Sequence, residues 1–237
     1  MRELFHSNNN KFLIINDGGK ENLNSLLSQA KEINVDGVIF IDRIDGDLVY
    51  YDLFNIDGSR AEVSGNGLGC LSLFLSLVTN KKEFRLVNSY FNSEFFSKVQ
   101  ENGVWVGFDL KSIDCEKEEV LGIVGYKLFV PNPHFVIPDK NFENESEKIE
   151  FLEKVFNFLK GNFNVHLFFY IKMFMYSFER GVGFTESCGS GTVACSFIYK
   201  NYINPNVQNL TIASKGGKID VRIEGNIYWI LTKPQRL

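Results

Sequence analysis

Two short glycine-rich segments carry the side chains best suited to chemistry in this chain. Residues 62–67 read EVSGNG and residues 186–191 read ESCGSG, so each has the form Glu-x-[Ser/Cys]-Gly-[Asn/Ser]-Gly. The segments lie about half of the chain apart, and an apolar stretch typical of a helix follows each one. The repeat predicts two related halves, each with one nucleophilic or proton-transferring side chain at a helix start: Ser64 in the first and Cys188 in the second.

Glycines at a helix N-terminus suit the binding of an anion such as a carboxylate, because backbone N–H groups there are unpaired and point outward. The same field favours a thiolate, so we expect a lowered pKa for Cys188. If both segments face one ligand, two proton-transferring side chains would flank one carbon from opposite sides. Such an arrangement suits moving a proton from one face of a stereocentre to the other. The simpler alternative is that Cys188 is a small apolar filler, as we expect Cys70, Cys115 and Cys195 to be.

The composition is that of a globular protein with no electrostatic preference for polyanions. Hydrophobic residues make up 44% and charged residues 23% of 237 residues. A net charge of −4 gives no reason to expect nucleic acid or an anionic membrane as a partner. The four cysteines and three histidines lack metal-ligand spacing, and we expect neither a metal nor an organic cofactor. The N-terminus lacks the apolar core of a signal peptide, which favours a reducing cytoplasm with free thiols.

The hydrophobic pattern predicts an α+β protein of two pseudo-symmetric lobes, each a mixed or antiparallel sheet with a central buried helix. The helix expected at 67–79 is apolar nearly all round, which is typical of a buried helix. The lobes are expected at 1–112 with roughly 229–237, and at 113–228, with the charged stretch 114–119 as a crossover between them. Helices are expected at 21–33, 67–79, 146–160 and 192–203. Strands are expected at 11–17 (ending at Gly18-Gly19), 38–42, 48–55, 83–88, 93–99, 103–110, 121–130, 134–137, 164–170, 172–179, 208–213, 217–223 and 226–232.

Four stretches, in the right order and spread over nearly the whole chain, resemble the diaminopimelate epimerase family. They are 54–67 (FNIDGSRAEVSGNG), 131–134 (PNPH), 164–165 (NV) and 178–191 (FERGVGFTESCGSG). The last of these is highly specific for the family.

The resemblance implies a PLP-independent, cofactor-independent isomerase that epimerises LL-diaminopimelate to meso-diaminopimelate, for lysine and peptidoglycan synthesis. It implies two lobes with the site in the cleft between them, a small amino-acid substrate as partner and a possible homodimer. In the family one cysteine thiolate takes the α-proton and a second cysteine thiol protonates the other face. Cys188 matches one of these cysteines, and Ser64 stands where the other is expected. Positions that match substrate contacts are Asn10, Asn55, Asn132, Asn164, Glu179 and Arg180, and those that match the backbone cradle of the reacting carboxylate are Gly65, Asn66, Gly189 and Ser190.

Ser64 is the main departure from the family pattern, because a hydroxyl is a far weaker acid than a thiol. The chain is then an engineered Cys→Ser variant, a natural enzyme with one impaired proton transfer, or a protein with one-sided chemistry such as elimination. In the related proline racemase group, a hydroxyl residue opposite a cysteine is associated with dehydratases. Leu68-Gly69 also replaces the usual Ala-Arg, and 6–12 lacks the usual glycines and aspartate. Together these departures favour considering a broader amino-acid racemase, for example of lysine, although Arg180 favours a substrate with a second carboxylate.

Three alternatives to an epimerase remain from the residues alone. The first is a dehydratase or lyase acting on a substituted amino acid. The second is a non-catalytic amino-acid-binding protein, in which Cys188 is structural. The third is a cysteine hydrolase with His134 or His166 as base, a weaker hypothesis because nothing in the sequence places either histidine beside Cys188.

Overall fold

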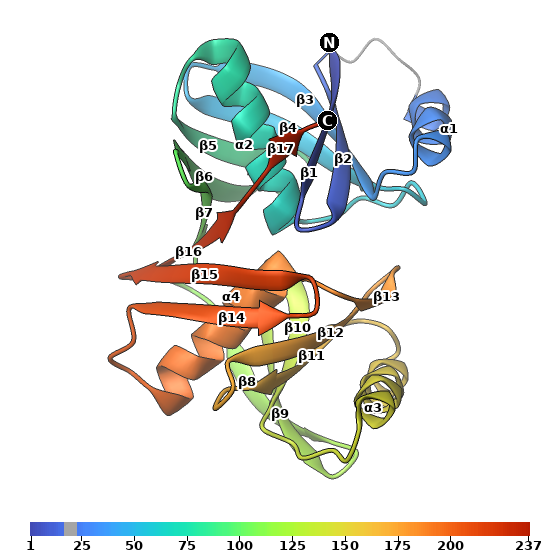
Figure 1. Ribbon diagram of the computed structural model, residues 1–237, viewed down its shortest axis with the longest axis vertical. Coiled ribbons are helices and arrows are strands. Elements are labelled where there is room, and N and C mark those ends of the chain that lie inside the picture. The colour runs from blue at the N-terminus through green and yellow to red at the C-terminus, as the bar shows by residue number, and fades with distance from the viewer. Residues whose placement is uncertain (17–22) are drawn as a thin grey trace. The chain divides into compact units, whose positions relative to one another are not determined.

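The computed structural model describes residues 1–16 and 23–237 and divides the chain into two units (Figure 1). Unit 1 comprises Met1–Phe108 with Leu231–Leu237, and unit 2 comprises Asp109–Ile230. Three expectations fall wholly or partly outside the described residues: the end of the first strand at residue 17, the stop at Gly18-Gly19, and the start of the first helix at 21–22.

Unit 1 is a mixed sheet with two helices. Neighbouring strands pair in the order antiparallel (β1–β2), parallel (β2–β3), antiparallel (β3–β4), parallel (β4–β5) and antiparallel (β5–β6, β6–β7). Its elements are β1 (Arg2–Ser7), β2 (Asn10–Ile15), α1 (Leu23–Glu32), β3 (Gly37–Asp45), β4 (Leu48–Asn55), α2 (Gly65–Thr79), β5 (Glu83–Asn88), β6 (Ser93–Gln100), β7 (Gly103–Asp109) and β17 (Gln235–Arg236).

Unit 2 repeats this plan. The pairs are antiparallel (β9–β10), parallel (β10–β11), antiparallel (β11–β12), parallel (β12–β14) and antiparallel (β14–β15, β15–β16). In unit 1 a helix follows β2 and another follows β4; in unit 2 a helix follows β10, and another follows β12 and the short β13. The elements are β8 (Cys115–Val120), β9 (Ile123–Val130), β10 (Asn132–Pro138), α3 (Glu145–Phe158), β11 (Asn164–Phe169), β12 (Phe174–Glu179), β13 (Gly183–Thr185), α4 (Gly189–Ile198), the π-helix η1 (Tyr199–Ile203), β14 (Asn209–Ser214), β15 (Gly217–Glu224) and β16 (Ile227–Thr232).

The matching order of strand directions and helices confirms the expected α+β fold of two similar lobes. The helices that follow the two motifs, α2 and α4, are buried on most of their surface, as an all-round apolar sequence predicts. The other two are amphipathic: α1 packs Leu26, Leu27 and Ala30 on its sheet, and α3 packs Leu152 and Val155. The central helices are therefore held rigidly, and so are the residues at their N-termini.

The charged stretch 114–119 is not a crossover but strand β8, which pairs antiparallel with β9, so that expectation was wrong. The connecting turn explains the hairpin, because Leu121 and Gly122 both have positive φ, 52° and 74°. This is the conformation that a two-residue hairpin turn requires. Glu116, Lys117 and Glu119 are exposed, which accommodates their charges on the strand. Strands β1, β13 and β17 were also not expected, whereas the other strands and helices agree with the sequence to within a few residues.

The end of the chain returns to unit 1. Strand β17 pairs antiparallel with β1, and the Leu237 N–H donates to the Leu4 carbonyl at 2.9 Å. The Thr232 hydroxyl, fully buried, donates to the carbonyl of Val104 at 3.0 Å. None of the helices described is both long enough and apolar enough to cross a membrane.

Candidate functional site

Ser64 is the N-cap of α2. Its backbone is extended (φ −133°, ψ 116°), and its hydroxyl oxygen accepts the N–H of Gly67 at 3.1 Å. Its carbonyl accepts the N–H of Leu68 at 2.8 Å, which starts the helix. Gly67 also saves space, since a Cβ there would lie 3.1 Å from the ring of Phe12, a tight contact. The hydroxyl of Ser64 therefore lies at the positive end of the α2 dipole.

Asn66, in the first turn of α2, gathers polar side chains from the N-terminal hairpin. Its amide donates to Asn10 Oδ1 at 2.7 Å, and its Oδ1 accepts from Asn8 at 3.1 Å and from Ser7 at 3.4 Å. Asn66 is buried, with 2% of its surface exposed. The structure thus brings together four of the sequence-predicted residues of unit 1, Ser64, Gly65, Asn66 and Asn10, which we call the Ser64 half-site.

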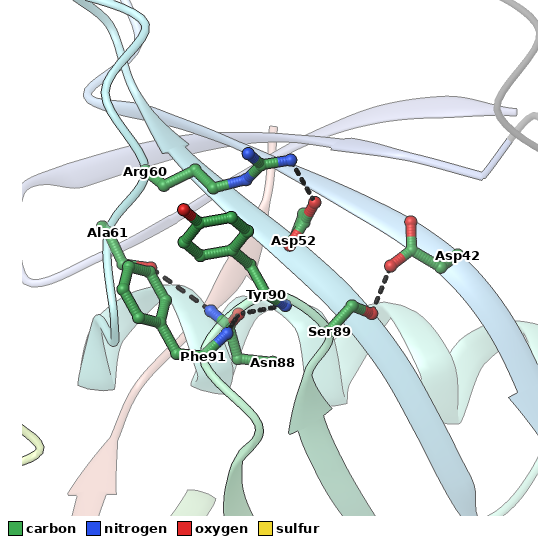
Figure 2. Close-up of polar contacts among 8 residues, drawn as sticks. All are labelled: Asp42, Asp52, Arg60, Ala61, Asn88, Ser89, Tyr90 and Phe91. Atoms are coloured by element: carbon green, nitrogen blue, oxygen red, sulfur yellow. Dashed lines mark hydrogen bonds and ion pairs between the residues drawn. The ribbon is translucent and has the colours of Figure 1, made fainter.

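The loop that leads into Ser64 is fixed by Asn88 at the end of β5 (Figure 2). The Asn88 amide donates to the carbonyls of Ala61 at 3.2 Å and Glu62 at 3.3 Å. Its Oδ1 accepts the backbone N–H groups of Tyr90 and Phe91, each at 3.1 Å. One buried side chain therefore ties the motif loop to the β5–β6 turn. No pattern in the sequence marked Asn88, because its role depends on pairing between distant segments.

Asn55 lies apart from these contacts, within its own turn at the end of β4. Its amide donates to the Ser59 hydroxyl at 3.0 Å, and its backbone N–H donates to the Ser59 carbonyl at 2.8 Å.

The glycine at position 69, which departs from the family pattern, has a steric cause. A Cβ on Gly69 would lie 2.1 Å from the Thr232 hydroxyl, so α2 has no room for a side chain there.

Cys188 caps α4 in the same way as Ser64 caps α2. Its backbone angles are φ −132° and ψ 111°, and its Sγ accepts the N–H of Gly191 at 3.3 Å. Its carbonyl accepts the N–H of Thr192 at 3.0 Å, and Ser190 Oγ lies 3.7 Å from the sulfur. Hence the repeated motif has one local structure, used twice.

The Cys188 thiol donates to Glu179 Oε2 at 3.1 Å, from the end of β12. The other carboxyl oxygen accepts the Thr185 hydroxyl at 2.5 Å, which fixes the orientation of the carboxyl group. Burial raises the pKa of Glu179, and the bonds from Thr185 and Cys188 oppose that shift. Cys188, Glu179, Gly189 and Ser190 form what we call the Cys188 half-site.

The expected lowering of the Cys188 pKa was wrong. Burial raises the pKa of this thiol well above its ordinary value, and the Glu179 carboxylate raises it further through its charge and its hydrogen bond. The Gly191 N–H and Ser190 act in the opposite direction but more weakly. The helix dipole alone suggested a thiolate, whereas the carboxylate that lies against the sulfur comes from the end of β12, outside the motif. The resting pair is a thiol that donates to an acceptor, so Glu179 is placed to take its proton.

The remaining sequence-predicted residues of unit 2 lie at strand ends, and two of them are connected by a hydrogen bond. Asn164, buried at the start of β11, accepts the backbone N–H of Arg180 on its Oδ1 at 2.9 Å. Asn132, also buried, starts β10, and the side chain of Arg180 is partly buried beside Glu179 in sequence. These residues therefore share the ends of neighbouring strands β10, β11 and β12.

Two buried histidines are connected to each other rather than to Cys188. His134 Nδ1 lies 2.8 Å from His166 Nε2, and His166 Nδ1 lies 2.9 Å from the Ser177 hydroxyl. The ring of His166 also lies against the first turn of α4, where a Cβ on Gly191 would be 2.4 Å from its Cε1. The hydrolase alternative gains no support, because among the described residues the Cys188 sulfur is hydrogen-bonded to Glu179, Ser190 and Gly191 and to neither histidine. Residues 1–16 and 23–237 contain no group of three or more His, Cys, Asp or Glu that could hold a metal ion.

Over most of its length the chain is similar to curated proteins named diaminopimelate epimerase. It is 27% identical over 236 residues to the protein of that name from Thermotoga maritima, and the alignment covers 94% of this chain and 94% of the relative. It is 29% identical over 203 residues to that of Methanopyrus kandleri, covering 81% of this chain and 67% of the relative. No family model matches the chain.

Two solved structures have the same fold. A "predicted epimerase" from Pseudomonas aeruginosa superposes with a TM-score of 0.74 at 12% identity, over 100% of this chain and 96% of that chain. A probable proline racemase from Agrobacterium radiobacter, solved with bound carbonate, superposes with a TM-score of 0.64 at 12% identity. The superposition covers 99% of this chain and 89% of that chain. At such identities the likeness concerns the fold alone.

Proposed function

We propose that this member of the diaminopimelate epimerase family, an amino-acid epimerase or racemase, converts LL-diaminopimelate to meso-diaminopimelate without a cofactor. The observation that carries the proposal is the Cys188 thiol hydrogen-bonded to Glu179 at the start of a helix. The matching cap at Ser64 and the names of the relatives support it. The product would serve lysine and peptidoglycan synthesis, and we propose a cytoplasmic location for the reaction.

The proton transfer at Cys188 begins with Glu179. The thiol proton moves to Glu179 Oε2 along their 3.1 Å hydrogen bond, and the resulting thiolate takes the substrate α-proton. The C–H bond breaks, an S–H bond forms, and the electron pair stays on the α-carbon and its carboxylate. The raised pKa of Glu179 suits this role, because an acceptor with a higher pKa takes the thiol proton more readily.

The developing negative charge would be held by backbone N–H groups at the two helix starts. Gly65 and Asn66 in α2 and Gly189 and Ser190 in α4 occupy the first turns, whose N–H groups have no intrahelical partner. Donors already fixed in position stabilise such charge without reorganisation. These four residues are the positions that we propose, from the family resemblance, as donors to the reacting carboxylate.

The opposite face of the α-carbon is assigned to Ser64. Among the described residues of unit 1 its hydroxyl is hydrogen-bonded to the Gly67 N–H and to no carboxylate or imidazole, in contrast to the Cys188–Glu179 pair. A serine hydroxyl, or a water bound to it, then delivers the second proton slowly. We accordingly propose that exchange at the Cys188 face is faster than complete epimerisation.

The distal end of the substrate is assigned to the asparagines and the arginine. Asn132, Asn164 and Arg180 lie at neighbouring strand ends of unit 2, where a guanidinium can bind a second carboxylate in a bidentate manner. Asn10 and Asn55 are the corresponding proposed contacts of unit 1. This assignment favours diaminopimelate over lysine, which has no second carboxylate for Arg180.

Proton NMR in deuterium oxide tests the proposal directly. With LL-diaminopimelate we expect loss of the α-proton signal and slow appearance of the meso isomer. Cys188→Ser is the matched control, because it keeps a capping side chain and removes the thiol; it should abolish exchange. If the unmodified protein exchanges no α-proton and binds no diaminopimelate by calorimetry, the proposed function is wrong. Binding without exchange would instead favour the non-catalytic amino-acid-binding alternative, and epimerisation of lysine at a comparable rate would favour the broader racemase.

A second candidate is a dehydratase or lyase, which the hydroxyl at Ser64 favours. Removal of the α-proton by Cys188 would then be followed by loss of a β- or γ-substituent rather than by reprotonation. The distinguishing products are a keto acid and ammonia in place of the mirror isomer. Serine, threonine and their homologues, assayed with a coupled ammonia readout, separate this reaction from epimerisation.

A further inference from the structure

Both motif loops are held at the same carbonyl. Each motif begins with a glutamate two residues before the cap, Glu62 in unit 1 and Glu186 in unit 2. The Asn88 amide donates to the carbonyl of Glu62 at 3.3 Å, and the backbone N–H of Gly216 donates to that of Glu186 at 2.8 Å. The two residues that hold these carbonyls lie outside both motifs.

These two residues occupy matching places in the fold. Asn88 is the last residue of β5, and Gly216 lies in the turn after β14. Strand β5 pairs parallel with β4, as β14 pairs parallel with β12, and each of the two follows the central helix of its unit in the chain. The β5–β6 turn (89–92) and the β14–β15 turn (215–216) are therefore equivalent elements of the two units.

A second contact joins each turn to its loop, at the fourth residue before the cap. In unit 1 that residue is Arg60, whose guanidinium lies 4.2 Å from the ring centroid of Tyr90 in the turn (Figure 2). In unit 2 it is Phe184, and the ammonium of Lys215 in the turn lies 5.2 Å from the centroid of its ring. The cation and the aromatic ring have exchanged sides, but the pairing is the same. We call Arg60, Asn88 and Tyr90 the Ser64 anchor, and Phe184, Lys215 and Gly216 the Cys188 anchor.

Hydrogen bonds are the stronger part of each anchor. Asn88 is 1% exposed and bonds two carbonyls of the loop and two N–H groups of the turn, so its loss leaves buried groups unpaired. In the Cys188 anchor the bond comes from the backbone, and a Cβ on Gly216 would lie 3.0 Å from that of Ser187. The side chains of Arg60 and Lys215 are 40% and 35% exposed, so their contacts with the rings contribute less.

We propose that each anchor is a positioning element for the proton-transferring side chain of its own half-site: the Ser64 anchor acts on Ser64, and the Cys188 anchor acts on Cys188. Only one buried residue lies between each held carbonyl and the cap, Val63 in unit 1 and Ser187 in unit 2. A shift of the turn is therefore passed to the cap, and a misplacement of about 1 Å can cost about 100-fold in rate. The anchors are features of the fold itself, whereas their effect on proton transfer rests on the proposed function.

The Ser64 anchor is tested by two rates measured with LL-diaminopimelate in deuterium oxide. Exchange of the α-proton reports on Cys188, whereas appearance of the meso isomer also needs protonation from the Ser64 side. Tyr90→Ala should slow epimerisation about 2- to 5-fold and Asn88→Ala about tenfold, with α-proton exchange unchanged. Tyr90→Phe keeps the ring, so this matched control should behave like the unmodified chain.

Changes in the Cys188 anchor should have the opposite effect on the ratio of the two rates. Lys215→Met should slow α-proton exchange about 2- to 5-fold, and Lys215→Arg should restore it. Gly216→Ala pushes on Ser187 and should slow α-proton exchange about tenfold. Epimerisation should change less, because protonation from the Ser64 side is its slow step. A merely structural role lowers both rates in proportion, and an unchanged ratio in both anchors would overturn the proposal.

Amide hydrogen exchange of the free chain is a readout that needs no substrate. The N–H groups of Gly67 and Gly191 are bonded to the two capping side chains and report on the two caps. Tyr90→Ala should speed amide exchange at Gly67 about 2- to 5-fold and leave Gly191 unchanged, and Lys215→Met should do the reverse. Equal changes at both amides, or none, would overturn the proposal. The expected amide pattern in a chain without α-proton exchange would leave the anchors intact and contradict the proposed function alone.

Discussion

Replacing Ser64 with cysteine is the most informative change, because the structure contains its own control. The two caps have nearly the same backbone angles, and the thiol of Cys188 accepts an N–H at 3.3 Å where the Ser64 hydroxyl accepts one at 3.1 Å. A thiol at position 64 can therefore keep the cap. We expect the free energy of unfolding of Ser64→Cys to change by less than about 1 kcal/mol, the typical cost of losing a helix cap altogether.

The expected gain in turnover is much larger than this change in stability. A well-placed general acid or base contributes about 10²- to 10⁴-fold to a rate. Ser64 supplies little of this factor, since its hydroxyl is a poor acid and, in the part of unit 1 that the structure describes, has no carboxylate or imidazole partner. Ser64→Cys should therefore raise epimerisation of LL-diaminopimelate by at least about 100-fold, equivalent to about 2.7 kcal/mol of activation free energy.

The assay follows the α-proton and both stereoisomers by NMR in deuterium oxide, with urea unfolding of each variant in parallel. Ser64→Ala is the matched control, because it removes both the cap and the hydroxyl and should lose about 1 kcal/mol of stability without gaining activity. A rise of less than about threefold in Ser64→Cys, in a protein as stable as the original, would refute the argument that the missing thiol limits the reaction.

Three further predictions concern the supports of the two half-sites. Glu179→Gln should speed the alkylation of Cys188 at a given pH, because it removes the charge that raises the thiol pKa, while epimerisation falls by about 100-fold for lack of a proton acceptor. A carboxyl group whose pKa is raised by folding lowers the free energy of unfolding at pH values above its unfolded pKa. Glu179→Gln removes this group, so it should raise the free energy of unfolding near pH 7 and raise it much less near pH 4. Urea titration at both pH values measures the difference. Asn88→Ala should lower the free energy of unfolding by about 1–3 kcal/mol, because it leaves buried carbonyl and N–H groups unpaired. Asn88→Asp keeps the acceptor, so an equal loss of stability in that variant would contradict this account. Gly69→Ala gains up to about 1 kcal/mol of helix propensity but forces a clash with Thr232, so we expect a net loss of stability. If thermal unfolding shows a stabilised variant instead, the contact with Thr232 relaxes without cost.

The sequence predicted the elements whose cause is local. The helices after the two motifs, the position of Ser64 and Cys188 at their starts and most strands follow from glycine and apolar patterns over a few residues. Strand β8 was missed because its charges suggest a solvent-exposed connection, although the Leu121-Gly122 turn after it was a usable signal.

The parts of the site that were not predicted depend on contacts between distant segments. The Glu179–Cys188 hydrogen bond reverses the expected direction of the thiol pKa, and it appears only when β12 and α4 are in place. The pairing of His134 with His166 needs the parallel register of β10 and β11, which no single stretch of sequence specifies. Helix dipole and motif arguments therefore give the position of a reactive group more reliably than its protonation.

The return of residues 231–237 to unit 1 has a consequence for biosynthesis. While the ribosome is still translating, unit 1 lacks β17 beside β1 and the Thr232 hydroxyl beneath α2. Unit 2 is continuous in the chain and needs no later residue than Ile230. The first lobe to emerge is thus the last to be completed, and the Ser64 helix acquires its final packing only after the Cys188 helix has been synthesised.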